Sequence, residues 1–319
     1  MGVRCGFMLY QRISDIPLNL KGRVAVKIHM GEKGNKTHVS PGDVRIVFEK
    51  LRKAGCDPFL VDTTCLYQGP RNTPEGYAKV AKENGFSEFP VVIARDEDYV
   101  VKGGMKIAKA VLDADSLLVL SHGKGHMLTA YGGAIKNLGM GCVNKESKNQ
   151  IHKPTMPKHV SEKCKRCGAC ERVCPCGAIR LTEKGVEIAE KECAGCECCI
   201  ETCPTGALVS NPAGMEKSFR LFCLGAKQVI DSFERVAYIT VLKNITEHCD
   251  CKSDSGRVVC PDIGYLSGKT ALEIDQEAMH LISQRLDMGA LKKAQKDNPR
   301  ALDAATWSLF EKEAKRVFG

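Results

Sequence analysis

The segments CKRCGACERVCPCGA at residues 164–178 and CAGCECCIETCPTGA at residues 193–207 are two copies of one motif, offset by 29 positions. The second copy repeats, without a gap, the residue types of Cys164, Cys167, Cys170, Cys174, Pro175, Gly177 and Ala178. Each copy has the spacing C-x2-C-x2-C-x3-C-P, which is typical of bacterial proteins with two [4Fe–4S] clusters. In that arrangement three cysteines of one copy bind one cluster, and the fourth binds the other cluster.

The repeat therefore predicts the ligands of both clusters. The first cluster is expected to bind Cys164, Cys167, Cys170 and Cys203. The second is expected to bind Cys193, Cys196, Cys199 and Cys174. Zinc also binds C-x2-C pairs, but two interlocked sets of four cysteines, each closed by proline, fit cubane clusters better. Cys176 and Cys198 lie outside the repeat, and we expect them to be small buried residues.

On both sides of the repeat, short apolar strands alternate with helices. Before it, strands are expected at residues 23–29, 58–63, 90–94 and 117–121, and helices at 43–54, 74–84 and 105–112. After it, a strand is expected at 236–242 and helices at 216–233, 271–286 and 301–318. This alternation predicts an α/β fold with a mostly parallel sheet covered by helices.

A polar segment from Asn144 to Lys158 marks the expected boundary before the repeat. The prediction is an α/β host domain formed by residues 1–157 and 213–319. Residues 158–212 would be inserted into this host as a small α+β ferredoxin-like domain with two clusters.

Composition limits the compartment and the partners. The first ten residues lack the charged, apolar and small-residue regions of a secretory signal, so we expect a cytoplasmic protein. In that reducing compartment, metal ligation explains eighteen cysteines better than disulfides do. No run of about 18 apolar residues is present, and the formal net charge of +9 is too small to indicate nucleic-acid binding. We expect neither a membrane nor a nucleic-acid partner, and the oligomeric state cannot be predicted.

Reactive side chains follow the predicted parallel strands, where ligands bind in doubly wound sheets. The candidate catalytic residues expected to line this crevice are Lys27, His29, His122, Lys124, His126 and Lys136. Burial of several cations and imidazoles without partners costs free energy. An anionic ligand, a metal or a carboxylate such as Glu32 or Asp62 would be needed to offset that cost.

Two interpretations of the crevice remain, one with a bound metal and one with a bound anion. A metal could bind His122 and His126, although the intervening Gly-Lys-Gly argues against a helix there. An anion or carboxylate bound by Lys27, Lys124 and Lys136 fits equally well. The segment from Gly132 onward is expected to begin a helix whose free amides can face an anion.

A third cysteine group lies after the strand predicted at 236–242. Cys249, Cys251 and Cys260 could bind a metal, with His248 or Asp262 as a fourth ligand. Free thiols explain the group equally well.

Five segments together resemble one known family, the family of the domain of unknown function 362, in its form with an inserted ferredoxin module. They are VKIHMGE at 26–32, DTTCLY at 62–67, SHGKGH at 121–126, GGAIKNL at 132–138 and PDIG at 261–264. The resemblance covers nearly the whole chain and implies an α/β host domain in a cytoplasmic redox protein. It implies no substrate and no catalytic residue. Lys252 and Ser253 depart from the family's pattern, which argues against a metal at Cys249 and Cys251.

Three functions follow as hypotheses. The first is an oxidoreductase whose two low-potential clusters pass single electrons to or from a substrate or cofactor in the crevice. The second is a non-catalytic electron carrier that docks to partner redox enzymes, and the third is an accessory protein for metal or cluster assembly. No GxGxxG motif and no P-loop is present at a strand–helix turn, so nucleotide cofactors have no support.

Overall fold

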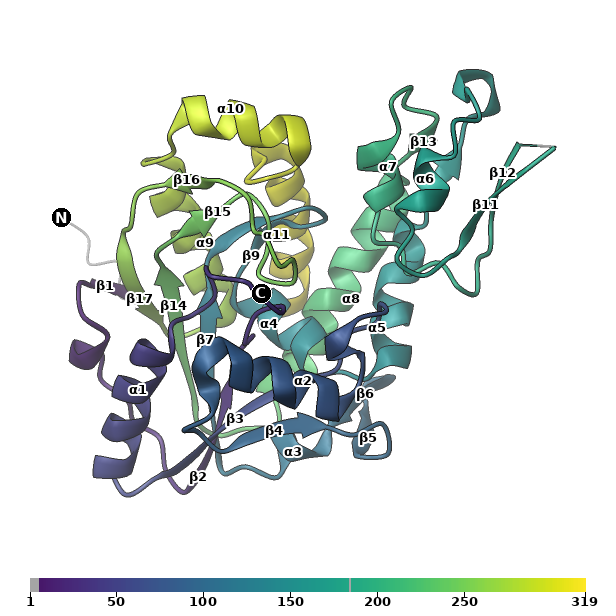
Figure 1. Ribbon diagram of the computed structural model, residues 1–319. Helices are drawn as coiled ribbons and strands as arrows, with labels where there is room; N and C mark the ends of the chain where they lie inside the picture. The colour runs from purple at the N-terminus through teal and green to yellow at the C-terminus, as the bar shows by residue number, and fades with distance from the viewer. Residues whose placement is uncertain (1–5, 184) are drawn as a thin grey trace.

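The computed structural model describes residues 6–183 and 185–319 and has a seven-stranded sheet at its centre (Figure 1). In their order across the sheet, the strands are β1 (Phe7–Tyr10), β17 (Gly264–Gly268), β14 (Val236–Leu242), β7 (Ser116–His122), β2 (Arg23–Lys27), β3 (Asp57–Thr63) and β4 (Val91–Ala94). The pairings from β14 to β4 are parallel, and β17 pairs antiparallel with β14 and β1. The predicted α/β fold with a mostly parallel central sheet is confirmed.

Helices cover both faces of this sheet. They are α1 (Pro41–Lys53), α2 (Pro74–Ala81), α3 (Lys109–Leu112), α4 (Ala134–Gly141), α5 (Lys145–His152), α8 (Pro212–Ile230), α9 (Ala271–Ser283), α10 (Met288–Asp297) and α11 (Ala304–Phe318). Alternate strand residues face opposite sides, so Val24 and Val26 pack in the core that includes α1 and α2. Ala25 packs in the larger core on the other face, which includes α4, α8, α9 and α11.

Local signals in the sequence set the helix ends. The Ser40 hydroxyl accepts a hydrogen bond from the Asp43 amide at 3.0 Å, and Pro41 begins α1. Thr73 caps α2 in the same way, again followed by proline. Gly55, after α1, has a φ of 78°, which glycine adopts without strain. These helices lie where the sequence predicts them, within a few residues.

Two segments differ from the prediction. The helix expected at 105–112 is a hairpin strand followed by one helical turn: β5 (Tyr99–Lys102) pairs with β6 (Met105–Ala108) across Gly103 and Gly104. Both glycines have positive φ, as such tight turns require, and Ile107 on β6 packs in the large hydrophobic core. The polar segment expected as a boundary contains α5, which Asn144 caps.

Residues 158–212 lie between α5 and α8 and stand to one side of the sheet, at the upper right of Figure 1. Their elements are β10 (Lys158–His159), α6 (Ala169–Arg172), β11 (Ile179–Thr182), β12 (Gly185–Ile188), α7 (Cys198–Thr202) and β13 (Leu208–Val209). The starts of α6 and α7 are separated by the 29 positions of the sequence repeat. Cys170, Ile179, Cys199 and Leu208 form a small hydrophobic cluster of their own here.

The remaining short strands are β8 (Lys124–His126), which pairs with β9 (Ala130–Gly132), and β15 (Ile245–Thr246), which pairs with β16 (Val258–Cys260). In the described residues, no helix is long and apolar enough to span a membrane. The prediction about the first ten residues falls partly on residues 1–5, which lie outside the described range.

Candidate functional site

A cavity of about 250 Å³ lies at the carboxyl ends of β2, β3 and β7. Parallel strands end at the same edge of a sheet, so residues distant in sequence meet there. The structure brings all six candidate residues to its wall: Lys27, His29, His122, Lys124, His126 and Lys136. Two groups of polar contacts organise this wall, one around Asp62 and one around Asp250.

Asp62, on β3, binds the first group of side chains. Lys27 Nζ lies 3.0 Å from Asp62 Oδ1, and both side chains are almost fully buried. The Tyr77 hydroxyl donates to Asp62 Oδ2 at 2.5 Å, and His29 Nδ1 lies 3.3 Å from the same oxygen. Burial alone would raise the pKa of Asp62, but Lys27 and the hydrogen bond from His29 hold it well below its usual range. The carboxylate is therefore ionised.

His29 is oriented by these contacts. Its Nδ1 faces two oxygens, the Asp62 carboxylate and the Tyr77 hydroxyl, so the ring proton lies on Nδ1. Its Nε2 is buried and has no hydrogen-bond partner among the described residues. Burial lowers the pKa of His29 to about 4, although Asp62 opposes this shift. The ring is neutral near pH 7 and has an available lone pair in the wall of the cavity, as a general base requires.

Asp250 binds the second group. His122 Nδ1 lies 2.8 Å and Lys124 Nζ 3.2 Å from Asp250 Oδ2. His122 Nε2 donates to the Lys243 carbonyl at 2.8 Å. Burial would raise the pKa of Asp250, but His122 and Lys124 keep it far below the usual value. Because both ring nitrogens of His122 face oxygens, the metal site considered for His122 and His126 is not formed.

Two further expectations need correction. Glu32 does not neutralise the charge of the candidate lysines, because its carboxylate pairs with Arg71 at 2.8 Å. The amides at the start of α4 are not free for a ligand either. The carboxylate of Asp275, on α9, accepts from the Ala134 and Ile135 amides at 2.7 and 2.9 Å. A side chain from a distant helix therefore fills the position expected for an anion.

His126, on β8, and Lys136, on α4, also line the cavity. His126 Nδ1 accepts from the Leu128 and Thr129 amides, so its proton lies on Nε2. Burial, followed by the charge of Lys136, lowers the pKa of His126 well below its usual value. Burial and then Lys124 lower the pKa of Lys136 to about 7. Within the described residues, Lys136 forms no ion pair.

Sequence reasoning missed Arg71 and Lys148, which also line the cavity. Lys148 Nζ donates to Thr63 Oγ1, to the Thr64 carbonyl and to the Val143 carbonyl, at 2.5 to 2.9 Å. Burial lowers its pKa to about 8. Two signals were available in the sequence. Asn144 is a residue type that begins a helix, and Ile151 lies three positions after Lys148 and therefore on the same, buried face of α5.

The charge balance of the wall is strongly positive. The cations that line the cavity are Lys27, Arg71, Lys124, Lys136, Lys148 and Lys252, and among the described residues Asp62 is the one acidic side chain in its lining. Lys27, Lys124 and Arg71 have carboxylate partners. In the part of the chain that the structure describes, Lys136, Lys148 and Lys252 have none within ion-pair distance. Lys148 donates its hydrogen bonds to neutral oxygens, and Lys136 and Lys252 are half-buried. Positive charge that no carboxylate neutralises favours an anionic ligand in the cavity.

The cysteines predicted for the first cluster surround one hollow. Its lining includes Cys164, Cys167, Cys170 and Cys203. The structure therefore brings the last cysteine of the second copy beside the first three cysteines of the first copy. Backbone amides point at the sulfurs: Arg166 N lies 3.4 Å from Cys164 Sγ, and Ala207 N lies 3.2 Å from Cys203 Sγ. Amides that donate to thiolate sulfur are what an iron–sulfur site offers its cluster.

The second set has the same local geometry. Gly195 N lies 3.4 Å from Cys193 Sγ, and Ala178 N lies 3.2 Å from Cys174 Sγ. Burial, then the neighbouring Cys193 and Cys174, raise the pKa of Cys199 to about 12. Cys174 packs against the small hydrophobic cluster that contains Cys199. Cys196 lines the cavity of about 250 Å³ with Cys198.

A single metal ion has different requirements. Among residues 6–183 and 185–319, no group of three or more His, Cys, Asp or Glu side chains could hold one metal ion. Each cysteine around a cubane binds a different iron, so cluster ligands stand farther apart than the ligands of one ion. The residues present fit cubane clusters in their number, order and amide contacts.

The third cysteine group differs from the expectation. Cys249 and Cys251 are joined in a disulfide, so neither sulfur is a free thiolate for a metal. Cys260 lies on β16 and is buried in the large hydrophobic core. Neither the possible metal site of Cys249, Cys251 and Cys260 nor the alternative of three free thiols is formed in this structure. Metal ligation also does not explain this pair of cysteines, contrary to the inference from composition.

Comparisons with known proteins identify the family and no function. The family model described as Domain of unknown function (DUF362) matches residues 24–280. No curated protein matches the chain. A lactate racemase apoprotein from Thermoanaerobacterium thermosaccharolyticum is 12% identical with a TM-score of 0.42, over 86% of this chain and 52% of that one. A protein from Thermotoga maritima is 10% identical with a TM-score of 0.45, over 86% and 57%. The chain thus spans little more than half the length of these two structures.

Proposed function

The chain belongs to the family described as Domain of unknown function (DUF362), and we propose that it is an iron–sulfur oxidoreductase. Its two [4Fe–4S] clusters, held in a ferredoxin-like insert at residues 158–212, would pass single electrons to or from a small anionic molecule in the cavity. The observation that carries this proposal is the shared wall. Cys196, a predicted ligand of the second cluster, and the unpaired Lys136 line the same cavity.

The insert is fixed to the host beside that wall. The Thr155 hydroxyl, in the host, donates to the Gly195 carbonyl at 2.7 Å. Arg300 pairs with Glu197, so host residues contact both neighbours of Cys196. A fixed separation between redox centre and substrate is what repeated electron transfer needs, and a carrier that only docks to partners has no use for it. When bound, the clusters would supply electrons one at a time.

The other end of the insert faces outward. Cys167 is exposed, and so are three basic residues beside it, Lys163, Lys165 and Arg166. Electrons would therefore exchange at the first cluster with a redox partner protein, which the basic residues suit if that protein is acidic. The second cluster, beside the cavity, would exchange them with the substrate.

The residues around the cavity suit a proton-coupled reaction. His29 Nε2 is a candidate proton acceptor because Asp62 fixes its tautomer and burial keeps the ring neutral. Lys136, whose pKa burial lowers to about 7, can both bind an anion and release a proton near neutral pH. Reduction of a carbonyl or a carbon–carbon double bond in a carboxylate adds two electrons and two protons. Lys136 would donate one proton and solvent the other, and in the reverse oxidation His29 would accept a proton.

The test is anaerobic reoxidation of the reduced protein. Protein with both clusters would be reduced with dithionite and mixed with phosphate, keto acids and unsaturated carboxylates, while visible absorption reports the clusters. We expect at least one reducible carboxylate to reoxidise the clusters, with a higher KM for Lys136→Met. The exposed Lys79→Met variant on α2 is the matched control and should behave as wild type. Equal KM values for both variants, or no acceptor in the panel, would contradict the proposal.

A further inference from the structure

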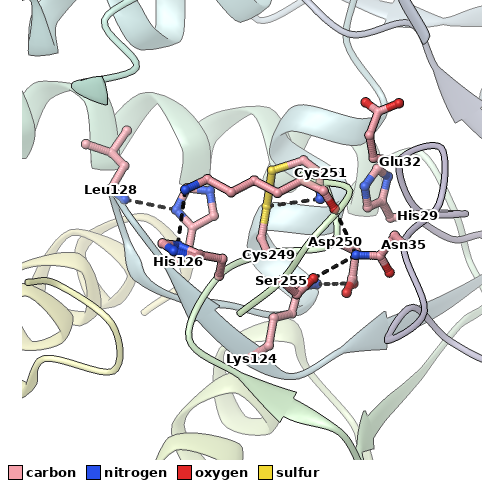
Figure 2. The surroundings of a disulfide bond; sticks show 12 residues. His29, Glu32, Asn35, Lys124, His126, Leu128, Cys249, Asp250, Cys251 and Ser255 are labelled. Atoms are coloured by element: carbon pink, nitrogen blue, oxygen red, sulfur yellow. Dashed lines mark hydrogen bonds and ion pairs between the residues drawn. A yellow bond between two sulfur atoms is a disulfide. The ribbon is translucent and has the colours of Figure 1, made fainter. Parts of the chain in front are cut away.

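We propose that Cys249 and Cys251 are a redox-active dithiol–disulfide pair, and that in this cavity they accept the two electrons that the two clusters deliver. The electron source in this inference rests on the proposed function, whereas the redox activity of the pair can be measured without clusters. Figure 2 shows the disulfide between His126 on one side and His29 on the other. Both cysteines line the cavity together with Cys196 and Cys198.

A role in stability does not explain this disulfide. A crosslink stabilises a fold mainly by restricting the unfolded chain, and the effect grows with the length of the closed loop. Cys249 and Cys251 are separated by two positions, so the loop they close is almost the smallest possible. The pair also lies in the wall of the cavity rather than between two elements that need to be held together.

The loop is fixed without the sulfur–sulfur bond. The Glu32 amide donates to the Asp250 carbonyl at 2.8 Å. Asn35 Nδ2 donates to the Lys252 carbonyl at 2.9 Å and to Ser255 Oγ at 2.7 Å, as Figure 2 shows in part. Because these contacts hold the loop between the two cysteines and just after Cys251, the bond can break without release of the loop.

The surroundings also favour the reduced form. The Cys251 amide donates to Cys249 Sγ at 3.4 Å, which would stabilise a thiolate on Cys249. Lys252 follows Cys251 in sequence and lines the same wall. The carboxylate of Asp250, which lies between the two cysteines, is neutralised by His122 and Lys124 at 2.8 and 3.2 Å. A disulfide is a better oxidant when its dithiol form is stabilised in this way.

The number of electrons that the two clusters deliver equals the number that reduction of the disulfide needs. Reduction breaks the Cys249–Cys251 sulfur–sulfur bond, adds two electrons and two protons, and leaves two thiols. One electron from each cluster supplies the pair, after a low-potential one-electron donor has reduced both clusters. The protons come from solvent or from Lys136, which lines the cavity. A two-electron oxidant, including a small disulfide, would reform the bond.

Two measurements test the proposal separately. In the first, cluster-free protein is equilibrated anaerobically with glutathione at graded ratios of the reduced and oxidised forms, trapped by alkylation and digested. We expect the peptide that contains Cys249 and Cys251 to change from the disulfide to two alkylated thiols within the range of ratios. A peptide that stays in one form at every ratio would overturn the proposal. The Cys56→Ser variant is the control, because Cys56 is buried elsewhere and serine can keep its hydrogen bond to the Leu20 carbonyl.

In the second measurement, cluster-loaded protein receives two electrons per chain from dithionite. We expect the loss of the disulfide peptide and the return of both clusters to the oxidised spectrum, whereas Cys249→Ser and Cys251→Ser should keep the clusters reduced. Clusters that stay reduced beside an intact disulfide would overturn the electron transfer, while the proposed function stands. Absence of iron and sulfide would instead refute the proposed function, and the glutathione result would still decide whether the pair is redox-active.

Discussion

Replacement of Asp62 by asparagine should destabilise the protein strongly at neutral pH. Asp62 and Lys27 form an ion pair at 3.0 Å in which the side chains are 4% and 1% exposed. Asp62→Asn keeps the shape but leaves the Lys27 ammonium buried with uncharged acceptors alone, among them the Asn137 side chain and the Ile28 carbonyl. Loss of one partner of a buried pair costs about 3–5 kcal/mol. At about 2 °C per kcal/mol for a chain of this size, the thermal midpoint should fall by about 6–10 °C.

The pH dependence distinguishes charge from packing. The folded pKa of Asp62 is lowered, so the stability that it contributes is complete above its unfolded pKa of about 3.9 and is lost as the pH falls below that value. The difference between wild type and Asp62→Asn should therefore stay constant from pH 7 to about pH 4 and shrink as the pH falls further. The double variant Lys27→Met with Asp62→Asn removes both charges and should recover most of the loss at pH 7. Anaerobic scanning calorimetry measures all three proteins. A double variant no more stable than the single one would refute the ion-pair reasoning.

Three further predictions concern the clusters. Metal and sulfide analysis should find about eight iron and eight labile sulfides per chain, with magnetic coupling between two [4Fe–4S] centres in the reduced state; zinc without sulfide would contradict this. Cys174→Ala should damage the cluster bound by Cys193, Cys196 and Cys199, and spectroscopic loss of the other cluster alone would show that the pairing is wrong. Redox titration should give midpoints on the order of −400 mV, raised somewhat by Lys163, Lys165 and Arg166, and a positive midpoint would argue against ligation by cysteine alone.

The sequence predicted the parts of the fold that depend on local chemistry. Ser40 and Thr73 begin helices because their hydroxyls cap free amides, and that signal lies within three residues of the amides it satisfies. The convergence of Lys27, His29 and His122 was also predictable, because the direction of parallel strands fixes which of their ends meet.

Contacts made by irregular segments could not be predicted. Asp250 binds His122 across 128 positions from a loop without regular structure, and the sequence there drew attention to its cysteines. Asp275 fills the start of α4 from a helix 140 positions away. Such pairs depend on the packing of whole elements, which periodicity and spacing do not describe. The same limit explains why the Cys249–Cys251 disulfide was not foreseen in a protein expected to be cytoplasmic.

Differences between the two copies of the repeat indicate which copy docks to the host. Arg166 and Gly195 occupy equivalent positions and share a positive φ, but Arg166 is exposed and Gly195 is buried. A Cβ on Gly195 would lie 2.1 Å from the His152 carbonyl oxygen and 2.6 Å from Thr155 Oγ1. Glycine is therefore required in the second copy by the host surface and not only by the cluster loop. The loop that carries Cys196 must approach the host backbone this closely to reach the cavity.

Gly195→Ala should consequently push this loop away from the host. Gly206→Ala is the matched control, because Gly206 has a similar φ of 62° but nothing within 4 Å of an added Cβ. Alanine at positive φ destabilises both variants by on the order of 1 kcal/mol. Gly195→Ala also brings its Cβ into a clash with the His152 carbonyl oxygen. We expect Gly206→Ala to keep both clusters and near wild-type reoxidation by the cavity ligand, and Gly195→Ala to lose the second cluster or to slow that reoxidation. If the two alanine variants keep equal cluster content and equal reoxidation rates, contact between the second copy and the host does not govern electron transfer into the cavity.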